Sequence, residues 1–315
     1  MAISQFQCEL SWSASRAREF QRCRRENWFA RYGSWGWWKE KPPGKRYEIM
    51  VHKNLTSLAA FAGDCVHRSL ERWFELRRAG TRMTAAELFE EARALFRAGW
   101  RESQGGGWKE RPNRRNHLEE HHYGVEIPRE RTESLRALME RCARTFIELP
   151  ELESVRESAP EEWLAVEAMD TYQFLGTRVY AIPDFAMREG ERIHIYDWKT
   201  GRPREEDRFQ LHTYALYACE KWAADPESID LHAVYLGMGK VETLMVDPYH
   251  LSEVQDRMSE SVRAMMEIHY DPDRDAAEME HWGATGAPEA CPRCRFRGLC
   301  DAAPVSGAAG SPASA

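Results

Sequence analysis

Hydrophobic spacing divides the chain into a helical first half and a strand-rich second half. In the first half, apolar residues recur at helical spacing in four segments, which predicts four helices. These helices are expected at residues 13–32, 55–79, 84–100 and 129–149. Thr84 precedes the third segment and Glu87 follows three positions later, the spacing of a capping box. Residues 33–44 are irregular and rich in tryptophan, and residues 104–124 form a polar loop with helix-breaking glycines.

From residue 162 onward the pattern changes to short runs rich in valine, isoleucine, tyrosine and phenylalanine, which predict strands. The expected strands are residues 162–168, 176–187, 192–199, 231–236 and 241–246. Amphipathic helices are expected at residues 205–222 and 251–269. The tail after Asp301 is rich in alanine, glycine, serine and proline, and we expect it to be disordered.

This order of elements predicts an α/β fold with a mixed sheet flanked by helices. A chain of 315 residues is long enough for one large core or two small domains. We expect five parts. They are a basic and aromatic segment 1–54, a core 55–79 and 160–270, a helical insertion 80–159 that divides this core, a cysteine segment 271–301 and the tail 302–315.

Composition is that of an ordinary globular protein, with 43% apolar and 30% charged residues. No apolar run approaches the ~20 residues of a membrane span, and residues 1–10 lack a signal-peptide pattern. We therefore expect a cytoplasmic location in which thiols stay reduced. The eight cysteines then favour metal or cluster ligation over disulfides.

Positive charge is concentrated in one stretch although the net charge is −7. Residues 16–53 hold eleven lysines and arginines and four acids. A local basic face on an acidic protein suits a polyanion that binds in one place. Aromatic residues are interleaved with these cations: Phe20, Trp28, Phe29, Tyr32, Trp35, Trp37, Trp38 and Tyr47.

Cations that follow phosphates, together with aromatic faces that stack unpaired bases, suit a single-stranded nucleic acid. The basic loop residues Trp108, Lys109, Arg111, Arg114 and Arg115 are a candidate second contact. In the alternative interpretation, the aromatic residues only pack against one another and the arginines are solvated. The chain has no G-x4-G-K-[ST] motif, so any unwinding would require a helicase partner.

The strands between residues 176 and 199 bring charged groups together. Gly190-Glu191 fits a two-residue hairpin loop with glycine first, and this register places Asp184 opposite Asp197, with Cβ atoms ~5 Å apart. Lys199 points to the same face. Opposed like charges destabilise a ladder, and a divalent cation between them removes that penalty; oxygen ligands favour Mg²⁺ or Mn²⁺. Alternatively, the three residues are an exposed surface cluster.

Pro183-Asp184, twelve residues and Asp197-Trp198-Lys199 resemble the signature PD-x(12)-D-x-K of the PD-(D/E)XK nucleases. Residues 63–67 (GDCVH) are similar to the helical motif of RecB-type members, in which the histidine binds metal. Gln210 and Tyr214 are similar to the Q-x3-Y motif of that subgroup. Glu167 lies where the superfamily often has an acid on its first core strand.

The resemblance implies a restriction-endonuclease-like fold and metal-dependent hydrolysis of DNA, by an exonuclease acting on single strands or ends in repair, recombination or defence. It implies the catalytic residues Asp184, Asp197, Lys199, Glu167, Gln210 and Tyr214, and the metal ligands His67, Asp184 and Asp197. An alternative is a non-catalytic nucleic-acid-binding subunit of a helicase–nuclease or defence complex. Another metal hydrolase is also open.

The flanking residues have structural alternatives. His67 fits a core histidine, Gln210 and Tyr214 fit a local pair at i,i+4 spacing, and Glu167 fits an exposed strand acid.

Cys291, Cys294 and Cys300 form a C-x2-C-x5-C pattern, three close thiols that suit a metal lacking one ligand. Cys23 is the expected fourth ligand and Cys8 its rival. This arrangement resembles the iron–sulfur staple of CRISPR adaptation nucleases and AddB-type nuclease domains, in which a [4Fe–4S] cluster joins the two ends of the chain. Tetrahedral Zn²⁺ on the same thiolates stays open. The remaining helical cysteines fit buried thiols: Cys65, Cys142 and Cys219.

Overall fold

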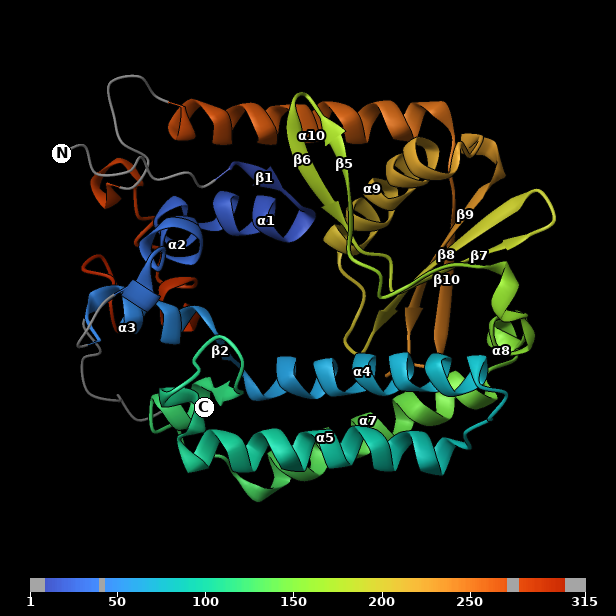
Figure 1. Ribbon diagram of the computed structural model, residues 1–315, viewed down its shortest axis with the longest axis horizontal. Helices are drawn as coiled ribbons and strands as arrows, with labels where there is room; N and C mark the ends of the chain where they lie inside the picture. The colour runs from blue at the N-terminus through green and yellow to red at the C-terminus, as the bar shows by residue number, and fades with distance from the viewer. Residues whose placement is uncertain (1–8, 40–42, 271–277, 304–315) are drawn as a thin grey trace, which may run out of the picture.

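The structure is a computed structural model that describes residues 9–39, 43–270 and 278–303 (Figure 1). Cys8 and the tail from residue 304 onward lie outside the described residues, so the expectations for them stay predictions. In the part of the chain that is described, no helix is long and apolar enough to cross a membrane.

A five-stranded mixed sheet lies at the centre, in the order β10-β9-β8-β7-β4. Its strands are β4 (Trp163–Val166), β7 (Phe185–Glu189), β8 (Arg192–Lys199), β9 (Ile229–Tyr235) and β10 (Lys240–Met245). Strands β8 and β9 are parallel, whereas the other neighbours are antiparallel. A parallel pair needs a long crossover connection, and helix α9 (Glu205–Trp222) supplies it. The expected mixed α/β architecture is therefore confirmed.

The hairpin of β7 and β8 has the predicted register. Phe185 pairs with Tyr196 and Glu189 with Arg192, on either side of the turn at Gly190-Glu191. Gly190 has a φ of +61°, a left-handed conformation that a residue without Cβ adopts without strain. The register places Asp184, one residue before β7, opposite Asp197.

The single strand expected at residues 176–187 is wrong. The chain forms β6 (Thr177–Ala181) and β7, which belong to different sheets. Pro183 lies in the gap between them, and proline has no N–H to donate to a ladder. Strand β6 pairs instead with β5 (Asp170–Phe174), which the sequence pattern did not predict, and with β1 (Ser11–Trp12).

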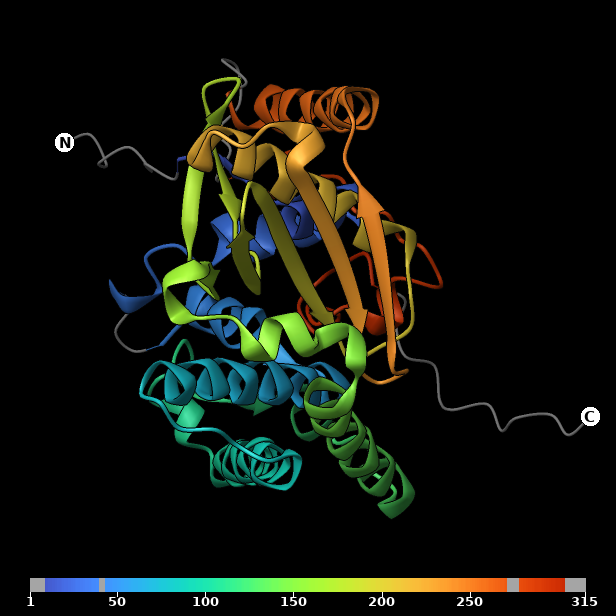
Figure 2. The same ribbon diagram turned by 90° about the vertical axis from the view of Figure 1, so that its right-hand side faces the viewer.

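Successive side chains of β8 enter two different hydrophobic cores. Ile193 and Ile195 belong to the core that includes α9 and α10 (Pro248–His269). Tyr196 and Trp198 belong to the core that includes helices α4 (Leu58–Arg78) and α7 (Arg129–Glu148). Figure 2 shows α10 above the sheet and the helical layer below it. The period of two along a strand is what gives the sheet two covered faces.

The long helices agree with the predicted segments to within a few residues. They are α4 (Leu58–Arg78), α5 (Ala85–Gly105), α7 (Arg129–Glu148), α9 and α10. The predicted capping box of Thr84 and Glu87 is present at the start of α5. The predicted division of the chain into core, insertion and cysteine segment stays a prediction.

The continuous helix expected at residues 13–32 is wrong. Helix α1 (Ala14–Arg22) ends at Cys23, whose backbone is extended, with φ −163° and ψ 114°. The chain then forms α2 (Arg24–Trp28) and a π-helical turn, η1 (Phe29–Gly33). The break places Cys23 in the lining of the same pocket as the C-terminal cysteines.

Short helices and two-residue strands lie between the long helices and strands. Helix α3, which was not expected, follows the tryptophan-rich turn, and β2 pairs in parallel with β3 of the polar loop. The short elements are η2 (Trp37–Lys39), α3 (Lys45–Lys53), β2 (Leu55–Thr56), η3 (Gly107–Lys109), β3 (His117–Leu118), α6 (Glu119–His122), η4 (Pro150–Leu152), α8 (Glu153–Glu157), η5 (Pro160–Glu162), η6 (Pro226–Ser228), η7 (Met279–His281) and η8 (Cys291–Arg293).

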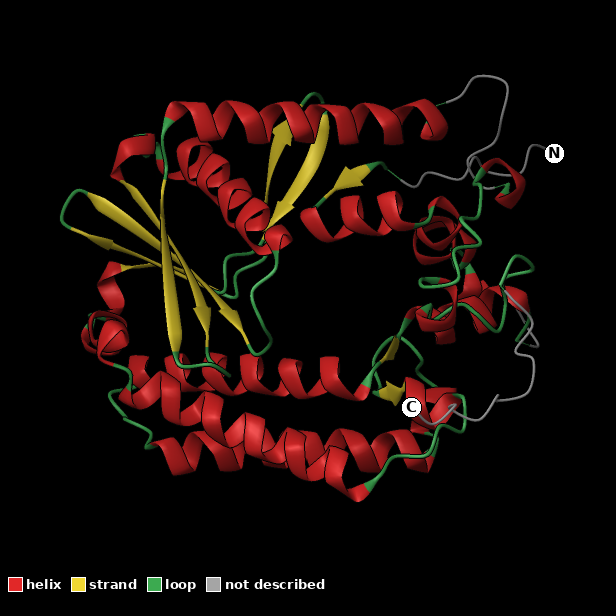
Figure 3. Ribbon diagram, turned by 180° about the vertical axis from the view of Figure 1, so that it is seen from behind, coloured by secondary structure: helices red, strands yellow, loops and turns green. Residues whose placement is uncertain are grey.

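The N-terminal helices and the C-terminal segment lie side by side, at the end of the molecule away from the large sheet (Figure 3). The Arg25 side chain donates to the carbonyl of Trp282 at 2.6 Å. Arg295 donates to the carbonyl of Lys53 at 3.0 Å and to Glu19 at the same distance. These contacts join segments about 250 positions apart into one lobe, which we call the cysteine lobe.

Phe74 tests the packing of the helical layer on the sheet. Its buried ring stacks on Phe185 at 4.5 Å between centroids and meets Trp163 edge-on at 5.1 Å. We expect Phe74→Ala to lower the free energy of unfolding by about 3–5 kcal/mol, since it removes apolar contacts and leaves a cavity. Urea denaturation measures this change. Tyr249→Ala, at a side chain 76% exposed, is the control and should change stability by less than ~0.5 kcal/mol; equal effects would contradict the packing described.

Candidate active site

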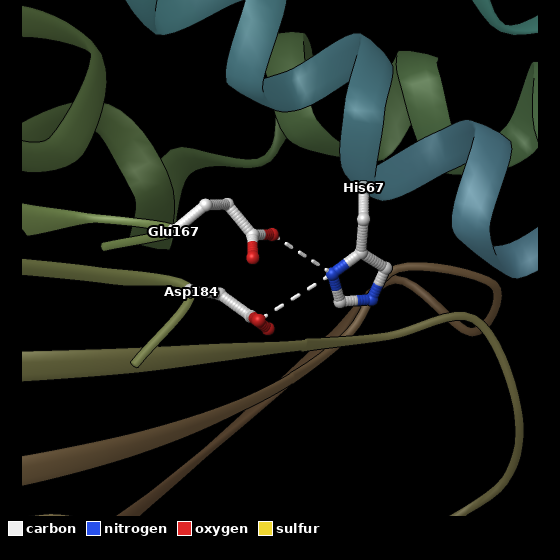
Figure 4. Close-up of side chains that lie close together, drawn as sticks. All are labelled: His67, Glu167 and Asp184. Carbon is white, nitrogen blue, oxygen red and sulfur yellow. Dashed lines mark hydrogen bonds and ion pairs between the residues drawn. The ribbon is translucent and has the colours of Figure 1, made fainter. Parts of the chain in front are cut away.

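Three metal-ligating side chains meet at the edge of the sheet (Figure 4). The Nδ1 atom of His67 lies 3.2 Å from Oε1 of Glu167 and 3.4 Å from Oδ1 of Asp184. All three ligand atoms lie within 4.8 Å of one another. The residues come from α4, from the end of β4 and from the start of β7, so the site depends on how the helical layer docks on the sheet.

Gly63 allows α4 to approach the sheet closely. A Cβ at this position would lie 3.2 Å from Oγ1 of Thr200, which follows β8. That distance is shorter than an ordinary van der Waals contact. A residue without a side chain therefore lets the helix backbone lie this close to Thr200. His67 lies four residues further along the helix and therefore on the same helical face.

Glu167 has a strained backbone. Its φ of +46° is left-handed, which costs a residue with a side chain on the order of 1–3 kcal/mol. The Glu167 N–H donates to the carbonyl of Asp184 at 3.0 Å, which holds the ends of the two strands together. Strain of this kind concentrates at functional sites, and here it accompanies a carboxylate that contacts His67. Glu167 is thus not simply an exposed strand acid.

A second group of side chains lies beside these ligands. Nζ of Lys199 lies 2.5 Å from Oδ2 of Asp197 and donates to Oε1 of Gln210 at 3.4 Å. Nε2 of Gln210 donates to the Tyr214 hydroxyl at 2.6 Å and to Oδ1 of Asp197 at 3.5 Å. Gln210 and Tyr214 do pair locally, and Gln210 also connects α9 to the Asp197–Lys199 pair.

Asp184 links the two groups. Its Oδ2 accepts a hydrogen bond from the backbone N–H of Trp198 at 2.5 Å, while Oδ1 faces His67. Asp197 is only 1% exposed, and its carboxylate pairs with Lys199. The three-ligand group therefore contains two of the expected metal ligands, His67 and Asp184, together with Glu167 in place of Asp197.

The charges of the site shift one another's pKa values. Burial and the neighbouring Asp184 raise the pKa of Asp197 to about 7. Burial alone would lower the pKa of Lys199, but Asp197 and Asp184 outweigh it and the pKa is raised. Burial would likewise lower the pKa of His67, yet Asp184 and Glu167 raise it well above its usual value. The negative charge of the site therefore exceeds the positive charge that His67 and Lys199 supply.

Asp207 is a member of the site that the sequence pattern did not identify. Its Oδ1 lies 3.9 Å from Nζ of Lys199, and its Oδ2 accepts from the Arg204 N–H at 2.9 Å and from the Tyr235 hydroxyl at 3.3 Å. An acid three residues into a helix is an ordinary capping position, and this explains why it carried no separate signal.

The donor set fits a hard divalent cation. Two carboxylate oxygens and one imidazole nitrogen lie close enough to share an ion, and such a set suits Mg²⁺ or, because of the imidazole, Mn²⁺. The excess negative charge and the strained Glu167 are further features that a bound cation would balance. His67, Glu167 and Asp184 are thus the residues that would hold it.

The comparison with protein families identifies the superfamily of the chain. The model of the PD-(D/E)XK nuclease superfamily matches residues 11–301, nearly the whole chain. The chain belongs to the PD-(D/E)XK nuclease superfamily. This membership indicates a metal-dependent nuclease that acts on phosphodiester bonds. No curated protein matches the chain.

The four expected cluster cysteines line one pocket of the cysteine lobe. Cys23 lies there with Cys291, Cys294 and Cys300, beside Phe29 and Phe296, whose rings stack at 5.1 Å. The other three described cysteines lie elsewhere: Cys65 and Cys142 are buried in α4 and α7, and Cys219 is partly buried in α9.

His67 provides a test of the metal-ligand group. We expect His67→Ala to weaken Mn²⁺ binding at least as much as the ~10–100-fold typical for loss of an outer-shell partner, because one of three ligand atoms is removed. Isothermal titration calorimetry with Mn²⁺ alone measures this. His250→Ala, at the exposed start of α10, is the matched control. An unchanged affinity in His67→Ala would return His67 to the role of a core histidine.

Proposed function

We propose that this chain is a DNA exonuclease that hydrolyses phosphodiester bonds in single strands or at strand ends. The observation that carries the proposal is the meeting of His67, Glu167 and Asp184 beside the Asp197–Lys199 pair. The likeness of GDCVH and of Gln210–Tyr214 to RecB-type motifs supports DNA and strand ends as the substrate. Repair, recombination and defence are the settings that this likeness suggests, and a helicase or defence-system protein is the partner it suggests.

A cation held by His67, Glu167 and Asp184 would polarise the phosphate and lower the pKa of the attacking water. The chain's own residues supply the rest. Because its pKa is raised, Lys199 is a protonated donor, suited to orienting the water and to offsetting charge that develops on the phosphate. Asp197 keeps Lys199 charged, and Gln210 fixes the position of both groups through its two hydrogen bonds.

The network gives Tyr214 a positioning role. Its hydroxyl accepts from Gln210, and burial followed by the charges of Asp197 and Asp184 raises its pKa well above the usual value. Tyr214 is therefore neutral and oriented. It fixes the amide of Gln210 such that the amide oxygen faces Lys199 and the amide nitrogen faces Asp197.

Three single variants test the nuclease. We expect Asp184→Ala, Asp197→Ala and Lys199→Ala each to lower cleavage by about 10²-fold or more, and combined variants to lose little more, since residues that act as a unit are non-additive. The assay is digestion of end-labelled single- and double-stranded DNA, linear and circular, with Mg²⁺ or Mn²⁺. Lys240→Ala, on the edge strand β10, is the control.

The substrates separate the alternatives. An exonuclease degrades linear DNA and spares circles, so cleavage of circular DNA would instead indicate an endonuclease. A wild-type protein that binds DNA and cleaves none of these substrates would identify a non-catalytic subunit. Near wild-type cleavage by Lys199→Ala would show that the assigned site is wrong.

We also propose that Cys23, Cys291, Cys294 and Cys300 hold a [4Fe–4S] cluster. All four cysteines line one pocket of the cysteine lobe. Their likeness to the staple of CRISPR adaptation nucleases and AddB-type nuclease domains supports a cluster over a single Zn²⁺ ion.

Iron content tests the cluster. Anaerobically purified protein should be brown and contain about four irons per chain. Replacing Cys23 or Cys300 with alanine should lower the unfolding midpoint and the iron content, because a link between distant chain segments removes unfolded-state entropy. Cys219→Ala is the matched control outside the pocket. Stoichiometric zinc without iron would exclude the cluster and keep the link, whereas well-folded protein without either metal would exclude both.

A further inference from the structure

The aromatic residues of the basic stretch separate into two sets. The first set packs the interior of the cysteine lobe and is buried: Phe20, Trp28, Phe29 and Tyr32. For these residues, the interpretation as packing is correct. The second set lies in the turn after η1, where Trp35 and Trp38 are 43% and 50% exposed. Interior packing does not account for two large exposed indoles so close together.

The exposed indoles line a pocket together with basic groups. The ring centroids of Trp35 and Trp38 are 5.6 Å apart with the ring planes at 74°, and Trp37 lies 6.3 Å from Trp38. Gly36 makes the turn possible with a φ of +80°. The pocket has a volume of about 420 Å³, and Arg31, Lys53 and Asn113 complete its wall. This volume is within the ~300–1,000 Å³ range of ligand pockets.

Positive charge is crowded at the base of this pocket. Burial, followed by the neighbouring Arg31, Arg295 and Arg16, lowers the pKa of Lys53 to about 8. Glu19 acts against these cations, and it already contacts Arg295 at 3.0 Å and Arg31 at 3.7 Å. A phosphate would relieve the crowding, because an anion near several cations stabilises their charged forms.

We propose that this pocket is a nucleotide subsite for single-stranded DNA, in which an unpaired base stacks on one of the two indoles, Trp35 or Trp38, and a phosphate binds Lys53 and Arg31. The inference rests on the proposed DNA nuclease function. Aromatic faces above a basic track bind unpaired bases with little sequence preference. A paired base has both faces stacked within the duplex, so the subsite selects single strands.

A neighbouring groove adjoins the subsite and reaches α4. Asn113 lines both spaces, and the groove also contains Arg114 and Arg115. Further along, it contains Asp64 and Arg68, which flank His67 on α4. From Leu58, the first residue of α4, to His67 the helix rises about 14 Å at ~1.5 Å per residue. A strand held at the tryptophans therefore extends along α4 before it reaches the ligand group.

Fluorescence anisotropy of the full-length protein with labelled oligo(dT) in EDTA tests the subsite without cleavage. We expect Trp35→Ala/Trp38→Ala to lower the affinity by roughly 5- to 100-fold, the range for loss of base stacking. Trp35→Phe/Trp38→Phe should restore much of it, because phenylalanine also stacks. Lys53→Ala should weaken binding and reduce its salt dependence. Tyr249→Ala and Lys240→Ala are controls for an exposed aromatic and a cation elsewhere.

A second probe separates stacking from structural damage. Oligonucleotides of abasic residues keep the phosphates and lack the bases, so wild-type protein should bind them more weakly than oligo(dT). The double alanine variant should lose little further affinity for them, which is the non-additivity expected of two groups in contact. Equal losses on both probes, or wild-type affinity of the double variant for oligo(dT), would overturn the subsite.

The two assays distinguish a failure of the proposed nuclease from a failure of the proposed subsite. A wild-type protein that cleaves no DNA, but whose binding depends on the tryptophans and on the bases, would keep the subsite and remove the nuclease. A wild-type protein that cleaves, while the tryptophan variants bind oligo(dT) normally, would keep the nuclease and remove the subsite.

Discussion

The repulsion among three carboxylates at one end of the sheet is the constraint on which the rest of the structure depends. Glu167, Asp184 and Asp197 are brought together by the register of β7 and β8 and by the end of β4. Two cations offset them in the folded chain: His67 lies 3.4 Å from Asp184, and Lys199 lies 2.5 Å from Asp197. Each cation is fixed by a different helix, since α4 carries His67 and α9 supplies Gln210 to Lys199.

The helices on both faces of the sheet hold these charges in place. The pairing of Asp197 with Lys199 is buried, and a buried pair stabilises only where its remaining hydrogen-bonding capacity is satisfied. Gln210 provides that satisfaction from the α9 side. On the other side, Gly63 allows α4 close enough for His67 to reach two carboxylates. The two hydrophobic cores are therefore what position the charges.

The sequence predicted those parts of the site that depend on local rules. The turn at Gly190-Glu191 determined the register, and the side-chain period of two placed Lys199 beside Asp197. Pro183 divides the single expected strand into β6 and β7, and β6 then pairs with β5, which the strand pattern did not predict. The left-handed backbone of Glu167 and the break at Cys23 are imposed by tertiary contacts, which hydrophobic periodicity does not contain. For the same reason, the sequence could list the aromatic residues of the basic stretch but not separate the buried from the exposed ones.

Arg295 connects the pocket of the four cysteines to the pocket of Trp35 and Trp38. Arg295 lies between Cys294 and Phe296, and it donates to Glu19 in α1 and to the carbonyl of Lys53 at the end of α3. It therefore adds positive charge near Lys53 and also restrains the backbone of that residue. A group bound by the four cysteines would fix Arg295, and Arg295 in turn would fix one wall of the tryptophan pocket. A structural role of the cysteines and the proposed binding of single strands would thus be physically linked, although the carboxylate site lies on other elements.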